Sequence, residues 1–85
     1  MELLTLLRKP IVLERLGIQH AFLYTEIRDG RFTKPVKLTA PVSAWPSHEV
    51  DALVAARIRG ATDDQLKQLV SQLHAARAVA GLEVA

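Results

Sequence analysis

The stretch that decides the fold is residues 10–30, PIVLERLGIQHAFLYTEIRDG. Pro10 suits the first turn of a helix, where its missing N–H costs nothing, and Gly17 suits the end of that helix. A second short helix is predicted over residues 20–29, with Gly30 supplying the positive φ that stops it. Two short helices joined by a short turn that contains glycine form the helix-turn-helix pattern.

One face of each predicted helix is apolar, as packing on a core requires. In the first helix these positions are Val12, Leu13 and Leu16. In the second helix they are Leu23 and Ile27, spaced i and i+4. Both helices are therefore expected to bury one side and to leave the other side in solvent.

The hydrophobic period changes after Gly30 from helical to alternating. Residues 36–39, VKLT, place the valine and the leucine on one side and the lysine and the threonine on the other, as in a half-buried strand. A turn at Pro41 leads to a returning strand over residues 42–45. Because two strands alone are marginally stable in water, this hairpin must pack on the helices, with Trp45 as its anchor.

Two more helices are predicted after the hairpin. Ser47 is expected to cap the third helix, and Gly60 to close it. The apolar positions of the third helix follow helical spacing: Val50, Leu53, Val54 and Ile58. Residues 62–65, TDDQ, are a capping box that opens the fourth helix, which Gly81 is expected to end.

The fourth helix has a single apolar seam, made of Leu66, Leu69, Val70, Leu73, Ala76 and Ala80. It is expected either to fold back over the core or to pair with its counterpart in a second chain. The seam covers only about two heptads, which is too short for a stable isolated coiled coil.

The chain as a whole is predicted to be mainly α-helical with a small β-hairpin. Residues 1–60 are interpreted as a winged helix-turn-helix domain for binding DNA. Residues 61–85 are interpreted as a C-terminal helix that packs on this domain or mediates self-association. A chain of 85 residues with 49% hydrophobic and 24% charged residues has the composition of one small soluble globule.

Composition and spacing argue against several other classes of protein. The chain has no cysteine, which excludes disulfides and thiolate metal sites. It lacks a signal-peptide leader and any run of about 18 apolar residues, so a cytoplasmic protein is expected. His20, His48 and His74 lack the spacing of a metal or acid–base site, and no phosphate-binding glycine loop is present. We therefore expect no enzymatic activity, no cofactor and no small-molecule substrate.

The distribution of charge favours an anionic partner for the first half of the chain. Residues 1–40 hold seven basic and four acidic residues, whereas residues 41–85 hold four basic and five acidic ones. The basic half includes four residues at three-residue spacing: Arg28, Arg31, Lys34 and Lys37. Such a run is expected to meet an anion, although a solvated face is the commoner explanation of this pattern.

The outward face of the second helix carries groups suited to DNA. Its stripe at helical spacing consists of His20, Ala21, Tyr24, Thr25 and Arg28. A helix fits the major groove, where polar side chains near its N-terminus reach base edges. The alternative is an ordinary solvated helix face, and the flanking glycines and the hairpin favour the DNA-reading interpretation.

The chain resembles the AlpA-like phage and prophage regulators, relatives of the excisionases and of the MerR-type winged helix. The resemblance covers roughly residues 4–58. It rests on segments in matching order and spacing: residues 7–10 (LRKP), 17–18 (GI), 23–24 (LY), 30–38 (GRFTKPVKL), 44–45 (AW) and 49–52 (EVDA). The resemblance implies DNA binding through the second helix and the wing, in transcription regulation or in the excision of integrated elements.

Several positions depart from the pattern of these relatives. Gln19 stands where a serine helix cap is usual, and Ala21 and Phe22 stand where small or polar residues are usual. Thr25 replaces a common basic residue, and Pro41 replaces a frequent arginine near the wing tip. These departures remove favourable groups from the expected DNA face. Phe22 is expected to pack against the neighbours of Tyr24 or against the wing, and not to insert into DNA.

The leading hypothesis is a sequence-specific DNA-binding regulator or excisionase of a mobile element, with double-stranded DNA as its partner. The alternative is a winged-helix protein-interaction module that has lost its DNA contacts and binds through Phe22, Tyr24 and the last helix. The residues predicted to contact DNA are Gln19, His20, Ala21, Tyr24, Thr25, Arg28, Arg31, Lys34, Lys37 and Thr39.

Overall fold

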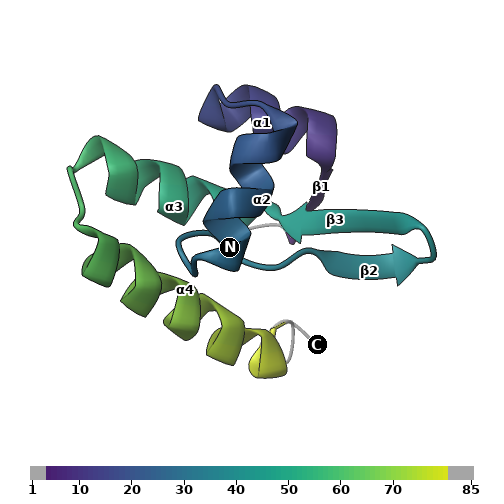
Figure 1. The fold of residues 1–85 in the computed structure, drawn as a ribbon. Helices are drawn as coiled ribbons and strands as arrows, with labels where there is room; N and C mark the ends of the chain where they lie inside the picture. Colours follow the sequence, from purple (N-terminus) through teal and green to yellow (C-terminus); the bar gives the residue numbers. More distant parts are fainter. Residues whose placement is uncertain (1–3, 81–85) are drawn as a thin grey trace.

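The computed structural model describes residues 4–80, which contain four α-helices, three strands and one short 3₁₀ turn (Figure 1). The first elements are β1 (Leu6–Arg8), α1 (Lys9–Leu16), α2 (His20–Arg28) and β2 (Val36–Thr39). The later elements are β3 (Val42–Pro46), α3 (Ser47–Ile58), α4 (Asp63–Ala76) and the 3₁₀ turn η1 (Arg77–Val79). The arrangement is a winged helix-turn-helix with an added C-terminal helix, as the sequence predicts.

The helix-turn-helix forms where its proline and glycines predict it. Pro10 lies in the first turn of α1, and Gly17 ends that helix with a left-handed φ of 67°. The Gly17 N–H donates to the main-chain oxygen of Leu13 at 2.8 Å, which closes the last turn. Gly30 follows α2 with a φ of 80°, a conformation that costs a residue with a Cβ roughly 1–2 kcal/mol.

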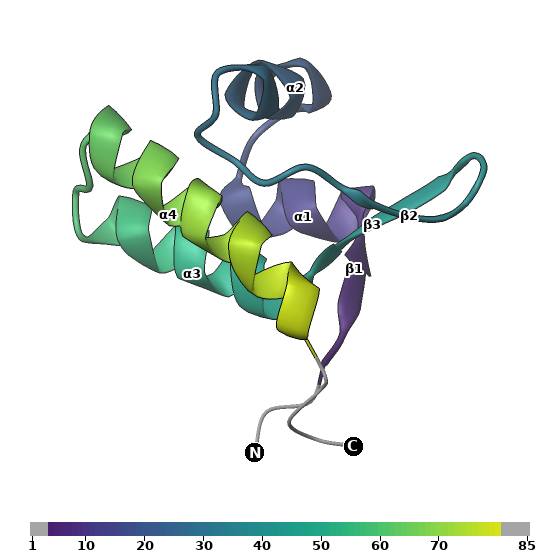
Figure 2. The same cartoon turned by 90° about the horizontal axis from the view of Figure 1, so that it is seen from below.

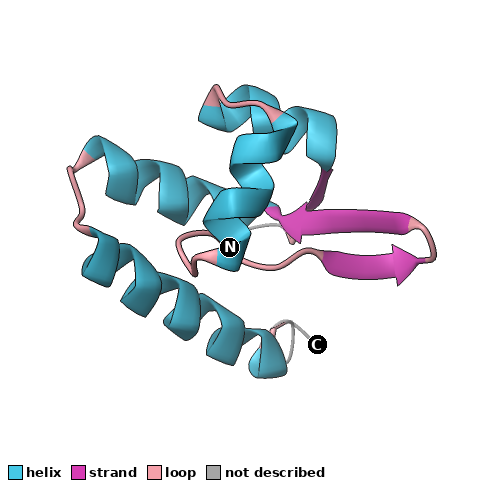
Figure 3. Ribbon diagram, viewed as in Figure 1, coloured by secondary structure: helices cyan, strands magenta, loops and turns pink. Residues whose placement is uncertain are grey.

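The sheet has three antiparallel strands in the order β1-β3-β2, one strand more than the predicted hairpin (Figure 3). Leu7 of β1 pairs with Trp45, and Leu6 pairs with Pro46. A strand of three residues is too short to show an alternating pattern of its own. β1 is a strand only because it pairs with β3, so it could not be predicted from the local sequence.

The wing formed by β2 and β3 projects away from the helices (Figure 2). Lys37 pairs with Ser43 and Thr39 pairs with Val42, so Leu38 is an extra residue in an irregular register. The prediction that Leu38 faces inward is therefore wrong: its side chain is 50% exposed. A bulge shifts the alternation of a strand by one residue, and a two-residue period read from the sequence does not detect this shift.

Trp45 joins the wing to the helices, as predicted. Its side chain is 1% exposed, and its Nε1–H donates to the main-chain oxygen of Thr33 at 2.9 Å. The core around it draws residues from every helix and from the loop before the wing: Val12, Leu23, Phe32, Trp45, Val50, Leu53, Ala56, Leu66 and Val70. The indole thus anchors β3 to the core and also holds the loop that leads into β2.

The third helix departs from the prediction at both ends. Ser47 does not cap α3 with its side chain but is its first residue, and its N–H donates to the main-chain oxygen of Thr5 at 2.7 Å. Ile58, predicted to face the core, is 81% exposed. The buried line of α3 runs instead in steps of three residues: Val50, Leu53 and Ala56.

The capping box of the fourth helix is confirmed. The Gln65 N–H donates to Thr62 Oγ1 at 3.2 Å, and the Thr62 N–H donates to Gln65 Oε1 at 2.9 Å. α4 packs on α3 and contributes Leu66 and Val70 to the core. The helix ends at Ala76, whose side chain is exposed, so the prediction that Ala76 belongs to the apolar seam is wrong.

The chain continues from α4 into η1, so the predicted extension of the apolar seam to Ala80 is also wrong. Gly81, the predicted end of the fourth helix, lies outside the described residues. Within residues 4–80, no helix combines the length and the apolar character that crossing a membrane requires.

Trp45→Ala is expected to lower the free energy of unfolding by about 3–5 kcal/mol, because it removes both the largest buried side chain and the anchor of the wing. Urea denaturation followed by circular dichroism measures this loss. Leu38→Ala, in the same wing but half exposed, is the control and should cost less than about 1 kcal/mol. Equal stability of Trp45→Ala and the parent would contradict the anchoring role.

Candidate nucleic-acid interface

The second helix of the helix-turn-helix turns one side outward (Figure 2). Exposed side chains from this region include Gln19, His20, Ala21, Tyr24 and Arg28. Thr25 is half-buried, and its Oγ1 donates to the main-chain oxygen of Ala21 at 3.1 Å. The predicted stripe of α2 is therefore exposed to solvent except at Thr25. The hydroxyl proton of Thr25 is donated within the helix.

Phe22 also lies on the outside of α2. Its side chain is 48% exposed, close to the 43% of Tyr24, so the prediction that it packs against the wing or its neighbours is wrong. α2 thus carries two large aromatic side chains in contact with solvent. Such residues occur at interfaces more often than on ordinary surfaces.

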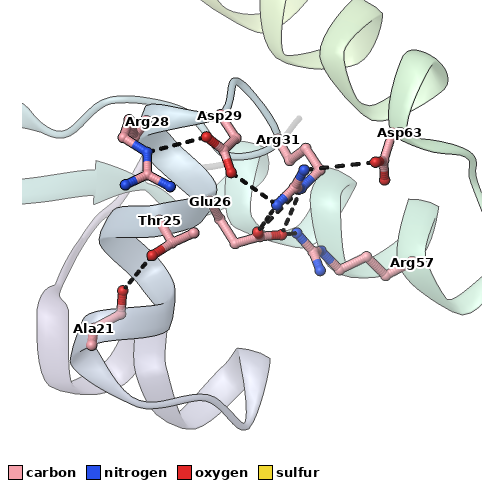
Figure 4. A network of polar contacts seen from close by, with 8 residues as sticks. All are labelled: Ala21, Thr25, Glu26, Arg28, Asp29, Arg31, Arg57 and Asp63. Carbon is pink, nitrogen blue, oxygen red and sulfur yellow. Dashed lines mark hydrogen bonds and ion pairs between the residues drawn. The ribbon is translucent and has the colours of Figure 1, made fainter.

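The buried side of α2 contains a carboxylate that the hydrophobic pattern did not reveal. Glu26 is 3% exposed, and its two oxygens accept from two guanidinium groups (Figure 4). Arg31 Nη2 lies 2.5 Å from Oε2, and Arg57 Nη2 of α3 lies 2.5 Å from Oε1. The hydrogen bonds from Arg31, and then those from Arg57, lower the pKa of Glu26 against the opposing effect of burial. The carboxylate is therefore charged and fully partnered.

Arg31 does not extend the basic face that the sequence predicts. Its guanidinium also contacts Asp29 (Nη2–Oδ2, 3.3 Å) and Asp63 of α4 (Nη1–Oδ2, 3.6 Å) (Figure 4). The hydrogen bond to Glu26, followed by the nearby negative charges, raises the pKa of Arg31. With these partners it joins α2 to α4, and three carboxylates already contact its guanidinium.

The remaining predicted basic residues are exposed but come from different segments. Arg28 ends α2 with its side chain 73% exposed, and it makes a contact of 3.2 Å with Asp29. Lys34 lies in the loop before the wing, and Lys37 lies in β2 together with Thr39. The exposed side chains are those of Arg28, Lys34, Lys37 and Thr39. The candidate interface therefore has a helical part and a wing part, with Arg31 turned inward between them.

This geometry agrees with a comparison against known families. A family model described as Prophage CP4-57 regulatory protein (AlpA) matches residues 5–58. The chain belongs to the AlpA family. No curated protein and no solved structure matches it significantly. The expected resemblance is confirmed, and membership places the chain among phage regulatory proteins.

The AlpA segment ends with α3, but α4 and η1 hold one of its loops in place. The Lys34 N–H donates to His74 Nε2 at 3.1 Å, and the Lys34 main-chain oxygen accepts from Arg77 Nη2 at 2.6 Å. Arg77 also pairs through two hydrogen bonds of 2.8 and 2.7 Å with Glu49, whose side chain is fully buried. The C-terminal region therefore fixes the residue from which the wing of this AlpA protein begins.

None of these long-range contacts follows from a local sequence pattern. In the sequence, Glu49 stands out only as part of the segment shared with the AlpA-like relatives, and His74 only as a histidine without the spacing of a metal or acid–base site. Among residues 4–80, no three histidine or carboxylate side chains gather as metal ligands would. The polar groups inside this AlpA protein serve instead to connect its helices.

Glu26→Gln is expected to lower the free energy of unfolding by about 3 kcal/mol, because Arg31 and Arg57 would keep their charges with no buried anion between them. Glu14→Gln, which changes an exposed glutamate of α1 in the same way, should change stability by less than about 0.5 kcal/mol. Chemical denaturation of both variants at pH 7 measures the difference. Similar small effects of the two substitutions would show that the buried network does not support the fold.

His74 should make stability depend on pH. Burial, and then the nearby Arg77, lowers the pKa of His74 in the folded protein. The unfolded chain therefore binds this proton at a higher pH, near 6.5. The stabilising effect of neutral His74 is present above that pH and is lost as the pH falls through the folded pKa.

The variant His74→Gln tests this dependence, since a glutamine oxygen can accept from the Lys34 N–H at every pH. Urea denaturation from pH 7.5 to pH 5 should show a smaller loss of stability for His74→Gln than for the parent. His20→Gln, which leaves the contact between His74 and Lys34 untouched, is the control and should retain the parental loss. An unchanged pH profile in His74→Gln would contradict the assignment.

Proposed function

We propose that this AlpA-family protein binds double-stranded DNA sequence-specifically and acts as a transcription regulator or an excisionase of an integrated element. The observation that carries the proposal is the two-sided character of α2. Its inner side is fixed by Leu23 and by the ionic network of Glu26, and its outer side presents polar and basic groups. A rigidly held helix with such a face is suited to the major groove.

The side chains of the helical part suit contacts with base edges. Arg28 can donate two hydrogen bonds in parallel to a guanine, and its position at the end of α2 leaves the guanidinium largely in solvent. Gln19 precedes α2 and has no capping hydrogen bond to the helix, so its amide is available to a base. These two residues are the proposed sequence readers.

The wing part suits the phosphate backbone. Lys34 and Lys37 are exposed cations, and Thr39 adds a hydroxyl near the wing tip. Contacts of this kind position a protein on a duplex without reading its sequence. The clamp that His74 and Arg77 form on the main chain of Lys34 supports this role, because it fixes where the wing leaves the core.

The second candidate function is a protein-interaction module, favoured by one observation. Phe22 and Tyr24 are both more than two-fifths exposed on the same helix, and an aromatic pair of this kind suits a protein partner. In this alternative the face of α2 meets a protein instead of a base-pair edge. Binding to duplex DNA separates the two functions.

The test is fluorescence anisotropy with labelled duplexes from the genomic neighbourhood of the gene, measured across a salt series. With Lys34 and Lys37 on phosphates, these two residues should contribute about −2 to the slope of log K against log salt. Arg28→Ala should cost about 1–3 kcal/mol of binding and relax the preference at one base pair. Lys37→Ala should weaken specific and random duplexes alike and make the slope shallower by about one.

The result that would move the assignment to the interaction module is the absence of binding to any duplex at low salt. A uniform loss in both variants would show instead that Arg28 does not read a base. The specificity would then have to come from Gln19 or from the shape of the DNA.

A further inference from the structure

Lys9 connects the start of α1 to the outward face of α2. Its Nζ lies 3.2 Å from the hydroxyl of Tyr24 and 3.3 Å from Nδ1 of His20. The same ammonium group lies 5.1 Å from the centre of the Tyr24 ring, within the range of a cation–π contact. The rings of His20 and Tyr24 are 4.8 Å apart. Lys9 is 11 residues from His20 and 15 residues from Tyr24 in the sequence, yet the three side chains form one surface cluster.

The chemistry of Lys9 decides where the protons of this cluster lie. An ammonium group only donates hydrogen bonds, so Nδ1 of His20 and the oxygen of Tyr24 must both accept from it. Neutral His20 then carries its proton on Nε2, the nitrogen that does not face Lys9. The hydroxyl proton of Tyr24 is likewise left to donate to another group. The cluster therefore offers an imidazole N–H, a phenol O–H and the third N–H of the ammonium.

The cluster also carries a net positive charge without an acidic partner. No carboxylate of residues 4–80 forms an ion pair with Lys9, whereas Arg28, Arg31 and Arg77 each pair with an aspartate or a glutamate. Hydrogen-bond donors around one cation, on an exposed surface, match an anion with several acceptor oxygens. A phosphodiester of the DNA backbone has this chemistry.

We propose that Lys9, His20 and Tyr24 form a phosphate-binding site on the DNA-facing surface, with Lys9 holding the other two side chains as donors. This inference rests on the proposed function and refines it. It assigns His20 and Tyr24 to the backbone of the DNA and leaves Gln19 and Arg28 to read bases. It also adds to the interface Lys9 of α1, which is not among the residues predicted from the sequence to contact DNA.

The test compares Lys9→Gln with Arg59→Gln, which removes one positive charge from the exposed end of α3. Binding to a labelled duplex is measured by anisotropy across a salt series. Lys9→Gln should bind about tenfold more weakly at 0.1 M salt and have a slope shallower by about one, as expected for one lost phosphate contact. Arg59→Gln should retain the parental affinity and slope. Thermal melting of both variants confirms that they are folded.

A second measurement asks whether the cluster acts as a unit on one phosphate. Tyr24→Phe should weaken the parent several-fold but have a smaller effect in the Lys9→Gln background, because Lys9 no longer orients the hydroxyl. Duplexes with single neutral methylphosphonate linkages locate the contact. One linkage should weaken the parent and have no further effect on Lys9→Gln.

The outcomes separate the inference from the function on which it rests. If the parent binds no duplex at any salt concentration, the proposed function fails and the phosphate site fails with it. If the parent binds while Lys9→Gln matches Arg59→Gln, the DNA-binding function stands and the phosphate site is overturned. Full sensitivity of Lys9→Gln to every methylphosphonate position would overturn it in the same way.

Discussion

Glu26 puts a negative charge inside the protein, on the side of α2 that faces the core. A carboxylate that is 3% exposed is tolerated only when its charge is balanced and its oxygens accept hydrogen bonds. Arg57 comes from α3, and Arg31 comes from the loop after α2 and reaches on to α4. The orientation of the outward face of α2 therefore depends on an ionic contact that the helix makes on its other side.

A second buried carboxylate, Glu49, repeats this arrangement. Glu49 lies fully buried in the first turn of α3, and Arg77 binds it from beyond the segment that matches the AlpA family. The same guanidinium binds the main chain of Lys34, so the start of the wing and the start of α3 share one partner. Both parts of the candidate interface are thus positioned by buried ion pairs that link distant segments. The C-terminal region contributes to each of them, through Asp63 of α4 and Arg77 of η1.

Local rules explain which features could be predicted from the sequence. Gly17, Gly30 and the capping box at Thr62 act within four residues, so their effects are visible in the chain itself. Trp45 was predictable because a lone hairpin needs an apolar anchor. Leu38 was misplaced because a bulge changes which side of a strand is buried, and Ile58 because the last residue of α3 lies beyond the part of the helix that packs on the core.

The candidate site was less predictable than the fold, because the binding partner of a charged residue is not encoded in its spacing. Arg31 stands at three-residue intervals from Arg28 and Lys34, yet its partner Glu26 turns it inward. Lys9 belongs to an apolar helix start and contacts α2 only once the two helices pack. The neighbouring residues in the sequence therefore do not indicate which partner a charged side chain will have.

The hydrogen bond from Trp45 to Thr33 has a practical consequence for optical work. The chain contains one tryptophan, and its indole is buried with its N–H bonded to the loop before the wing. Its fluorescence therefore comes from a single known place, the joint between the helices and the sheet. The aromatic residues that face outward, Phe22 and Tyr24, emit weakly or at shorter wavelengths. Trp45 is thus an intrinsic fluorophore that reports whether the wing stays attached to the helices, and no label on the binding surface is needed.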